Sequence, residues 1–158
     1  MSRLALFDLD DTLLDRESAF HTWAHGFIDC HNLSESSMET IIQIDLEGDK
    51  PVLLYFTELR EALGIRTSVG ELVEQFWDVY PTCFTVPDST FDALKRLRLA
   101  GWKLGIVTNG PPTQWKKIEA ANLIPYFDGF GISGEINRDS QTTCRHLHQG
   151  CGTVRCRT

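Results

Sequence analysis

The sequence predicts an α/β fold, in which a helical cap is inserted after the first strand of a doubly wound, Rossmann-like parallel sheet. Three features indicate this fold. A short apolar run meets acidic residues at 3–10, a long region of helical periodicity follows at 16–81, and helix-like and strand-like segments then alternate at 82–136. We therefore expect a core made of residues 1–15 and 82–136, a cap made of residues 16–81, and an irregular tail at 137–158.

The first element is expected to be a buried strand. The segment RLALFDL at 3–9 is short and mostly apolar. Strands of a parallel sheet are covered on both faces, so they read as nearly continuous apolar runs rather than alternating ones. The acidic residues would then lie where the strand ends and a loop begins.

The cap is expected to contain four helices. Apolar residues recur at helical spacing at both ends of the region, and two further helical segments, METIIQIDL and PVLLYFTELREALG, lie between them. Gly64 is the expected stop of the second of these, because glycine is favoured just past a helix C-terminus. The apolar positions of the two outer helices are Phe20, Trp23, Ala24, Phe27 and Ile28, and Leu72, Val73, Phe76, Trp77 and Tyr80.

Helix and strand alternate after the cap. PDSTFDALKRLRLAG is expected to be a helix with Asp88 or Ser89 as its N-cap and Gly101 as its stop. WKLGIVT and FDGFGIS are the expected second and third strands, with the helix PPTQWKKIEAANL between them. Lys116 and Lys117 are expected on the solvated face of that helix, since lysine is rarely buried.

Composition and charge argue against several classes of protein. The chain has 158 residues and a net charge of -7, which argues against a nucleic-acid-binding surface. No apolar stretch approaches the roughly 20 residues of a membrane span, and the first residues do not form a signal peptide. The odd number of cysteines, five, fits reduced thiols. We expect a cytoplasmic protein.

Polar groups gather where two strands are expected to end. Asp8 and Asp10 follow the first strand, and alternation would send both side chains into the crevice at the carboxyl edge of the sheet. Two carboxylates there repel unless a cation separates them, and Mg²⁺ prefers such oxygen ligands. Thr108 would add a hydroxyl, and the Asn109-Gly110 turn would add backbone N–H groups. This combination is typical of a phosphoryl-transfer site.

The same residues carry a resemblance to a known family. DLDDTLLD at 8–15 resembles the first motif of the haloacid dehalogenase superfamily, and KLGIVTNG at 103–110 resembles the second. The helical insertion is similar to the helical cap of that superfamily, and ANLIPYFDGFGISGEI resembles the approach to its third motif. The likeness runs from about Ser2 to Ile136.

The resemblance implies a Mg²⁺-dependent phosphomonoester hydrolase that acts on a small phosphorylated metabolite. It makes Asp8 the nucleophile that forms an aspartyl-phosphate, and Asp10 the group that protonates the leaving oxygen and then activates water. The Asp8 carboxylate and the Asp10 backbone carbonyl would bind the metal. The residues implied to bind the substrate are Thr12, Thr108, Asn109 and Gly110. Dehalogenases of the family lack an acid at the position of Asp10, so its presence favours a phosphatase.

The tail departs from the family pattern. After SGEI we find neither the third-motif Lys-Pro nor the acidic fourth motif, so the C-terminal part of the core is expected to be missing and the first strand to become a sheet edge. Shifting the reading by one base from Asn137 permits GIAKPxADIFxRAAExCG, which resembles the missing motif, so the tail is interpreted as a frameshift product. Its Cys144, His146, His148 and Cys151 alternatively suggest a zinc site. The departure leaves open a second function, that of a non-catalytic remnant.

Overall fold

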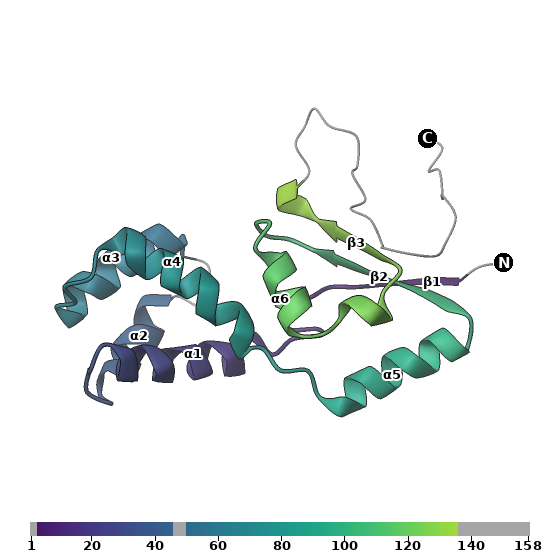
Figure 1. Ribbon diagram of the computed structural model, residues 1–158, viewed down its shortest axis with the longest axis horizontal. Helices are drawn as coiled ribbons and strands as arrows, with labels where there is room; N and C mark the ends of the chain where they lie inside the picture. Colours follow the sequence, from purple (N-terminus) through teal and green to yellow (C-terminus); the bar gives the residue numbers. More distant parts are fainter. Residues whose placement is uncertain (1–2, 46–49, 136–158) are drawn as a thin grey trace.

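The computed structural model describes residues 3–45 and 50–135, and it has two lobes (Figure 1). The helical lobe consists of α1–α4 and the sheet lobe of β1–β3 with α5 and α6, so the predicted α/β fold with helices inserted after the first strand is confirmed. The elements are β1 (Arg3–Phe7), α1 (Arg16–Cys30), α2 (Ser37–Asp45), α3 (Val52–Leu63), α4 (Val69–Val79), the 3₁₀ turn η2 (Tyr80–Cys83), α5 (Asp88–Leu99), β2 (Trp102–Thr108), α6 (Gln114–Ala120), the 3₁₀ turn η3 (Ile124–Tyr126), β3 (Gly129–Ile132) and the 3₁₀ turn η4 (Ser133–Glu135).

The sheet is parallel, with the strand order β1-β2-β3. Ala5 pairs with Leu104 and Phe7 with Ile106 in the first ladder, and Thr108 pairs with Ile132 in the second. Because all strands point the same way, the loops that follow β1 and β2 leave the sheet at one edge. This register determines where the acidic residues and the TNG turn meet.

One face of the sheet is packed and the other is open. Leu104 and Ile106 are 0% and 1% exposed, whereas Leu4 and Leu6 on β1 are 60% and 61% exposed and Val107 on β2 is 52% exposed. The prediction that β1 is buried on both faces is therefore wrong for the described chain. Within residues 3–45 and 50–135, β1 pairs with β2 alone, so it is a sheet edge as expected.

An aromatic cluster fills the helical lobe. The Trp23 ring on α1 lies edge-on to Phe76 of α4, at 5.0 Å between centroids, and to Phe56 of α3, at 5.9 Å. Phe56 is 0% exposed. The apolar positions predicted for α1 are all buried, as are Leu72, Phe76 and Tyr80, while Val73 and Trp77 are half-buried. Aromatic packing thus holds α1, α3 and α4 together.

The helix ends confirm one predicted stop and contradict one predicted N-cap. Gly64 ends α3 with a φ of 63°, as expected of a left-handed stop. Ser68 and Glu71 form a capping box at the start of α4, each bonded to the other's backbone N–H. The predicted cap of α5 is wrong: Pro87 occupies the N-cap position without a side-chain bond, and Asp88 lies in the first helical turn.

Asp128, just before β3, ties the elements of the sheet lobe together. Its carboxylate accepts hydrogen bonds from Arg98 of α5 (2.9 Å), and from the Lys103 ammonium (3.2 Å) and the Leu104 N–H (2.9 Å) of β2. Burial alone would raise the pKa of Asp128, but these three donors lower it below its ordinary value of 3.8. The carboxylate is therefore kept charged by the contacts that hold α5, β2 and β3 in place.

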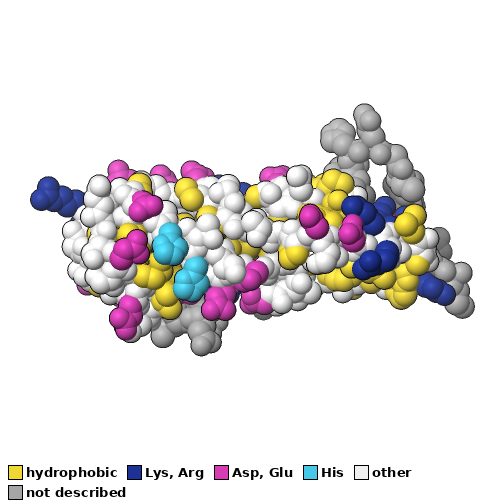
Figure 2. Space-filling model, turned by 90° about the horizontal axis from the view of Figure 1, so that it is seen from below, with side chains coloured by type: hydrophobic (Ala, Val, Ile, Leu, Met, Phe, Trp, Pro, Cys, Tyr) yellow, Lys and Arg dark blue, Asp and Glu magenta, His cyan; other side chains and the backbone are white. Residues whose placement is uncertain are grey.

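Charged side chains are unevenly distributed over the surface. On the face drawn in Figure 2, acidic side chains are scattered over both lobes, whereas most of the Lys and Arg side chains lie among hydrophobic ones at the far end of the sheet lobe. In the described part of the chain, no helix has both the length and the hydropathy to span a membrane.

Candidate active site

Four of the predicted site residues meet at the carboxyl edge of the sheet. Asp8 and Asp10 lie in the loop after β1, Thr108 is the last residue of β2, and Asn109 follows it. Together with Val107 they line a pocket of about 270 Å³. The parallel pairing of β1 and β2 produces this convergence, since it places the two strand ends side by side.

Thr12 and Gly110 lie outside this pocket. Thr12 is exposed in a tight turn that brings the Asp11 N–H to the Leu14 carbonyl at 2.8 Å. The Gly110 N–H, which was expected at the pocket mouth, donates instead to the Ser133 Oγ at 3.1 Å. Gly110 has a φ of 150°, and a Cβ there would lie 3.0 Å from the Gln114 side chain, so the position requires glycine.

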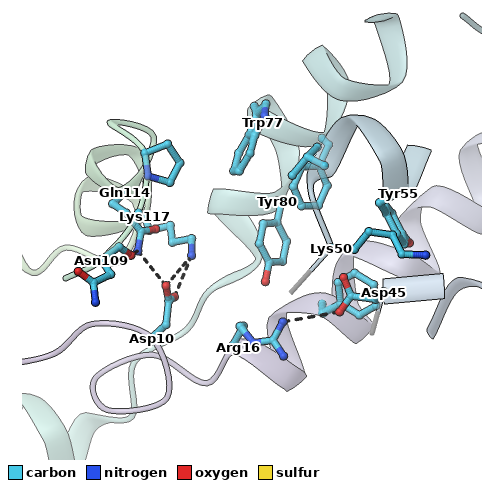
Figure 3. A pocket seen from close by; sticks show the side chains of 15 residues that line it. Asp10, Arg16, Asp45, Lys50, Tyr55, Trp77, Tyr80, Asn109, Gln114 and Lys117 are labelled. Atoms are coloured by element: carbon cyan, nitrogen blue, oxygen red, sulfur yellow. Dashed lines mark hydrogen bonds and ion pairs between the residues drawn. The ribbon is translucent and has the colours of Figure 1, made fainter. Parts of the chain in front are cut away.

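Helix α6 contributes Gln114, which sequence reasoning did not single out, and Lys117, which it weighed as a stand-in for the third-motif lysine but placed on the solvated face. The Gln114 amide nitrogen donates to Asp10 Oδ2 at 2.8 Å and to Thr108 Oγ1 at 3.0 Å. The Lys117 ammonium donates to Asp10 Oδ1 at 2.8 Å and to Asp10 Oδ2 at 3.0 Å (Figure 3). The prediction that Lys117 lies on the solvated face of its helix is therefore wrong, because the residue is only 7% exposed. Lys116 is exposed as expected.

Lys117 occupies a polar and aromatic environment. Its Nζ lies 4.8 Å from the centre of the Phe84 ring and 5.7 Å from that of Tyr80, in addition to its ion pair with Asp10. Ring faces carry partial negative charge and attract cations. Burial is also the main cause that raises the pKa of Tyr80, so its hydroxyl stays neutral.

A second pocket of about 190 Å³ lies where the two lobes meet (Figure 3). The sheet lobe contributes Asp10, Asn109, Gly110, Pro111 and the α6 residues Gln114 and Lys117 to its lining, so Gly110, which is outside the first pocket, lines this one. The helical lobe contributes Arg16, Phe20, Asp45, Lys50, Tyr55, Phe76, Trp77 and Tyr80. Because Asp10 lines both pockets, a group bound between the lobes would lie next to the carboxylates at the strand ends.

The site offers oxygen ligands for a hard cation. The Asp8 carboxylate is exposed, and the Asp10 backbone carbonyl lies in the same loop. Both groups offer oxygen ligands of the type that Mg²⁺ prefers. Among the described residues no group of three or more His, Cys, Asp or Glu side chains is placed to hold a metal. The Cys144, His146, His148 and Cys151 cluster lies outside the described residues.

Comparison with solved structures gives proteins of the same fold. The HAD-hydrolase YfnB from Bacillus subtilis, bound to magnesium, matches with a TM-score of 0.66 and 25% identity, over 84% of this chain and 64% of that one. A protein described as a beta-phosphoglucomutase from Thermotoga maritima matches with a TM-score of 0.66 and 18% identity, over 86% and 63%. A protein described as a phosphatase from Clostridium difficile matches with a TM-score of 0.55 and 19% identity, over 89% and 63%. The chain thus spans less than two thirds of the length of these structures.

The comparison with curated proteins gave no match. A family model described as haloacid dehalogenase-like hydrolase matches residues 3–143, which is most of the chain and extends slightly beyond the predicted limit at Ile136. The two motifs lie at neighbouring strand ends, the helical insertion follows the first strand, and the solved structures share this fold. The chain therefore belongs to the haloacid dehalogenase-like hydrolase family.

Proposed function

We propose that this site belongs to a Mg²⁺-dependent phosphomonoester hydrolase that works through an aspartyl-phosphate on Asp8. One observation carries the proposal: Asp8, Asp10, Thr108 and Asn109 line one pocket at the ends of β1 and β2. A carboxylate nucleophile, a second acid and a hydroxyl donor are the groups that such a reaction requires.

The proposed roles follow from the position of each group. Asp8 attacks phosphorus, and Asp10 protonates the leaving oxygen, then accepts a proton from the water that attacks the aspartyl-phosphate. Thr108, which is 3% exposed, holds a phosphoryl oxygen through its hydroxyl. The Asp8 carboxylate and the Asp10 carbonyl would hold Mg²⁺, which when bound would offset phosphoryl charge.

A small phosphorylated metabolite is the proposed substrate. The pocket between the lobes, about 190 Å³, leaves room for a small leaving group next to Asp10. Its lining combines aromatic rings with charged side chains, which suits a polar molecule with an apolar face. A cytoplasmic location stays a prediction.

A non-catalytic role is the second candidate. It is favoured by the residues that follow SGEI, which read NRDSQTTC in place of the Lys-Pro segment that the resemblance leads us to expect there. Charged partners of this kind typically supply several kcal/mol of transition-state stabilisation. We expect the 158-residue chain by itself to show no measurable Mg²⁺-dependent phosphatase activity.

A phosphatase screen with and without Mg²⁺ tests both candidates. It compares the 158-residue chain with a chain in which the segment after Ile136 is translated in the shifted frame, each with an Asp8→Asn partner. Activity of the shifted-frame chain that requires Mg²⁺ and Asp8 supports the hydrolase. Inactivity of both chains on all phosphate esters contradicts it, and robust Asp8-dependent turnover by the 158-residue chain contradicts the non-catalytic role. Sequencing the coding DNA around Asn137 tests the frameshift directly.

A further inference from the structure

Two neighbouring turns of one helix approach the same carboxylate. Gln114 and Lys117 lie three positions apart on α6, so their side chains are on one face of the helix. They are 4% and 7% exposed, and both contact Asp10, more than 100 residues earlier in the chain. Polar side chains are rarely buried to this degree unless they are fully bonded.

The orientation of the Gln114 amide is fixed by its neighbours. The Asp10 carboxylate and the Asn109 carbonyl, 3.3 Å away, can only accept hydrogen bonds, so the nitrogen of the amide must face them. The same nitrogen is 3.0 Å from Thr108 Oγ1. The two hydrogens of this nitrogen are thus shared among three acceptors, and the Thr108 hydroxyl itself donates to the Asn109 carbonyl at 3.4 Å.

The Lys117 ammonium completes the arrangement around Asp10. It bonds to both carboxylate oxygens, and Gln114 bonds to one of them. Three charge-assisted or amide bonds from one rigid helix leave the carboxylate little freedom to rotate. Phe84 and Tyr80, on which the ammonium packs, belong to the segment that returns from the helical lobe to the sheet lobe.

We propose that Gln114 and Lys117 form a clamp that fixes the orientation of the Asp10 carboxylate and, through Gln114, links it to the Thr108 hydroxyl. Both are positioning residues, because they act through Asp10 and Thr108 rather than on the substrate. Their role in the reaction rests on the hydrolase function proposed above. A carboxylate that is already oriented lowers the cost of orienting groups during phosphoryl transfer.

The clamp itself is tested without turnover, on the 158-residue chain. Brief acylation followed by mass spectrometry compares the reactivity of Lys117 with that of Lys116, which is 49% exposed and serves as the surface reference. We expect Lys117 to react at least roughly tenfold more slowly than Lys116, and Asp10→Asn to remove most of this protection. Equal reactivity of the two lysines, or protection unaffected by Asp10→Asn, would overturn the proposal whatever the activity of the chain.

The role in the reaction is tested on whichever chain the phosphatase screen finds active. An alkyl phosphate needs a proton on its leaving oxygen, whereas p-nitrophenyl phosphate has a leaving group that departs without one. Loss of acid positioning should therefore lower kcat on the alkyl phosphate by roughly 10–100-fold in Lys117→Met and Gln114→Met, and on p-nitrophenyl phosphate by much less. Lys117→Arg should restore part of the loss, and Lys116→Met should match the unmodified chain.

The outcomes separate the two proposals. Equal losses on both substrates would indicate a merely structural role and would refute the positioning role. If neither chain hydrolyses any phosphate ester, the hydrolase function fails, and the acylation experiment alone decides whether the clamp exists.

Discussion

The open face of the sheet predicts that the 158-residue chain associates with itself through β1. Leu4 and Leu6 point away from the packed face, and the Leu6 side chain lies over Gly105, where an added Cβ would approach it to 2.8 Å. β1 also offers backbone groups at a sheet edge, since in the described chain it pairs with β2 alone. Exposed apolar edges recruit other chains.

The exposed fraction of the two leucines determines how much free energy association through β1 can gain. Burying a leucine fully is worth about 1.5–3 kcal/mol. Leu4 and Leu6 are 60% and 61% exposed, so more than half of this burial free energy is not yet gained in the folded chain. Covering both side chains in an associated form would therefore contribute about 2–4 kcal/mol to association. Replacing both by threonine, which suits strands, should remove that gain and cost the folded chain less than about 1 kcal/mol per site.

The experiment compares Leu4→Thr/Leu6→Thr with Leu104→Thr, a matched change on the packed face. Leu104 is 0% exposed, so its replacement should lower the free energy of unfolding, measured with urea, by about 2–5 kcal/mol. Sedimentation analysis should show association in the unmodified chain that the double variant loses. A monomeric unmodified chain with strongly protected Leu4–Phe7 amides in hydrogen exchange would refute the reasoning, as would a double variant as unstable as Leu104→Thr.

Three further sets of predictions follow from the described contacts. In an active chain, Asp8→Asn should abolish turnover, because an amide cannot form the acyl-phosphate, and Asp10→Asn should slow the reaction by roughly 10²–10⁴; full activity of Asp8→Asn would exclude the covalent mechanism. Phe56→Ala should lower the free energy of unfolding, measured with urea, by about 3–5 kcal/mol, because it leaves a cavity at the centre of the aromatic cluster. A decrease below about 1 kcal/mol would show instead that the neighbouring side chains fill the cavity. The lowered pKa of Asp128 means that its carboxylate stabilises the folded chain above its ordinary pKa of 3.8, and that this contribution is lost as the pH falls through the lower folded-state pKa. Asp128→Asn should therefore destabilise the chain at pH 7 but not at about pH 2, and equal destabilisation at both would contradict this linkage.

The sequence was sufficient for the elements because their signals are local. The spacing of Phe20, Trp23 and Phe27 identified α1, and the turn after β2 identified the place where Thr108 would lie. The parallel-sheet rule then brought the two strand ends together without knowledge of side-chain contacts. Periodicity and topology thus predicted the site to the level of which loops meet.

Lys117 escaped prediction because its burial depends on a distant partner. A lysine on a helix is solvated in most proteins, and only the Asp10 carboxylate makes its burial favourable here. A signal was nevertheless present: Gln114, Lys117, Ile118 and Ala121 follow the i, i+3, i+4, i+7 spacing of a buried face. The apolar run of β1 by itself predicts burial on both faces, and only the expected loss of the C-terminal part of the core predicts that it lies at an open edge of the sheet.

The environments of the two carboxylates are what distinguish their proposed roles. Asp10 is half-buried and held by Gln114 and Lys117, whereas Asp8 is exposed, and its side chain has no hydrogen bond or ion pair with any described residue. A proton donor must present one oxygen in a fixed direction, because proton transfer requires hydrogen-bond geometry. The clamp therefore fixes the direction of Asp10, one of the two carboxylates, which agrees with the proposed role of Asp10 in proton transfer.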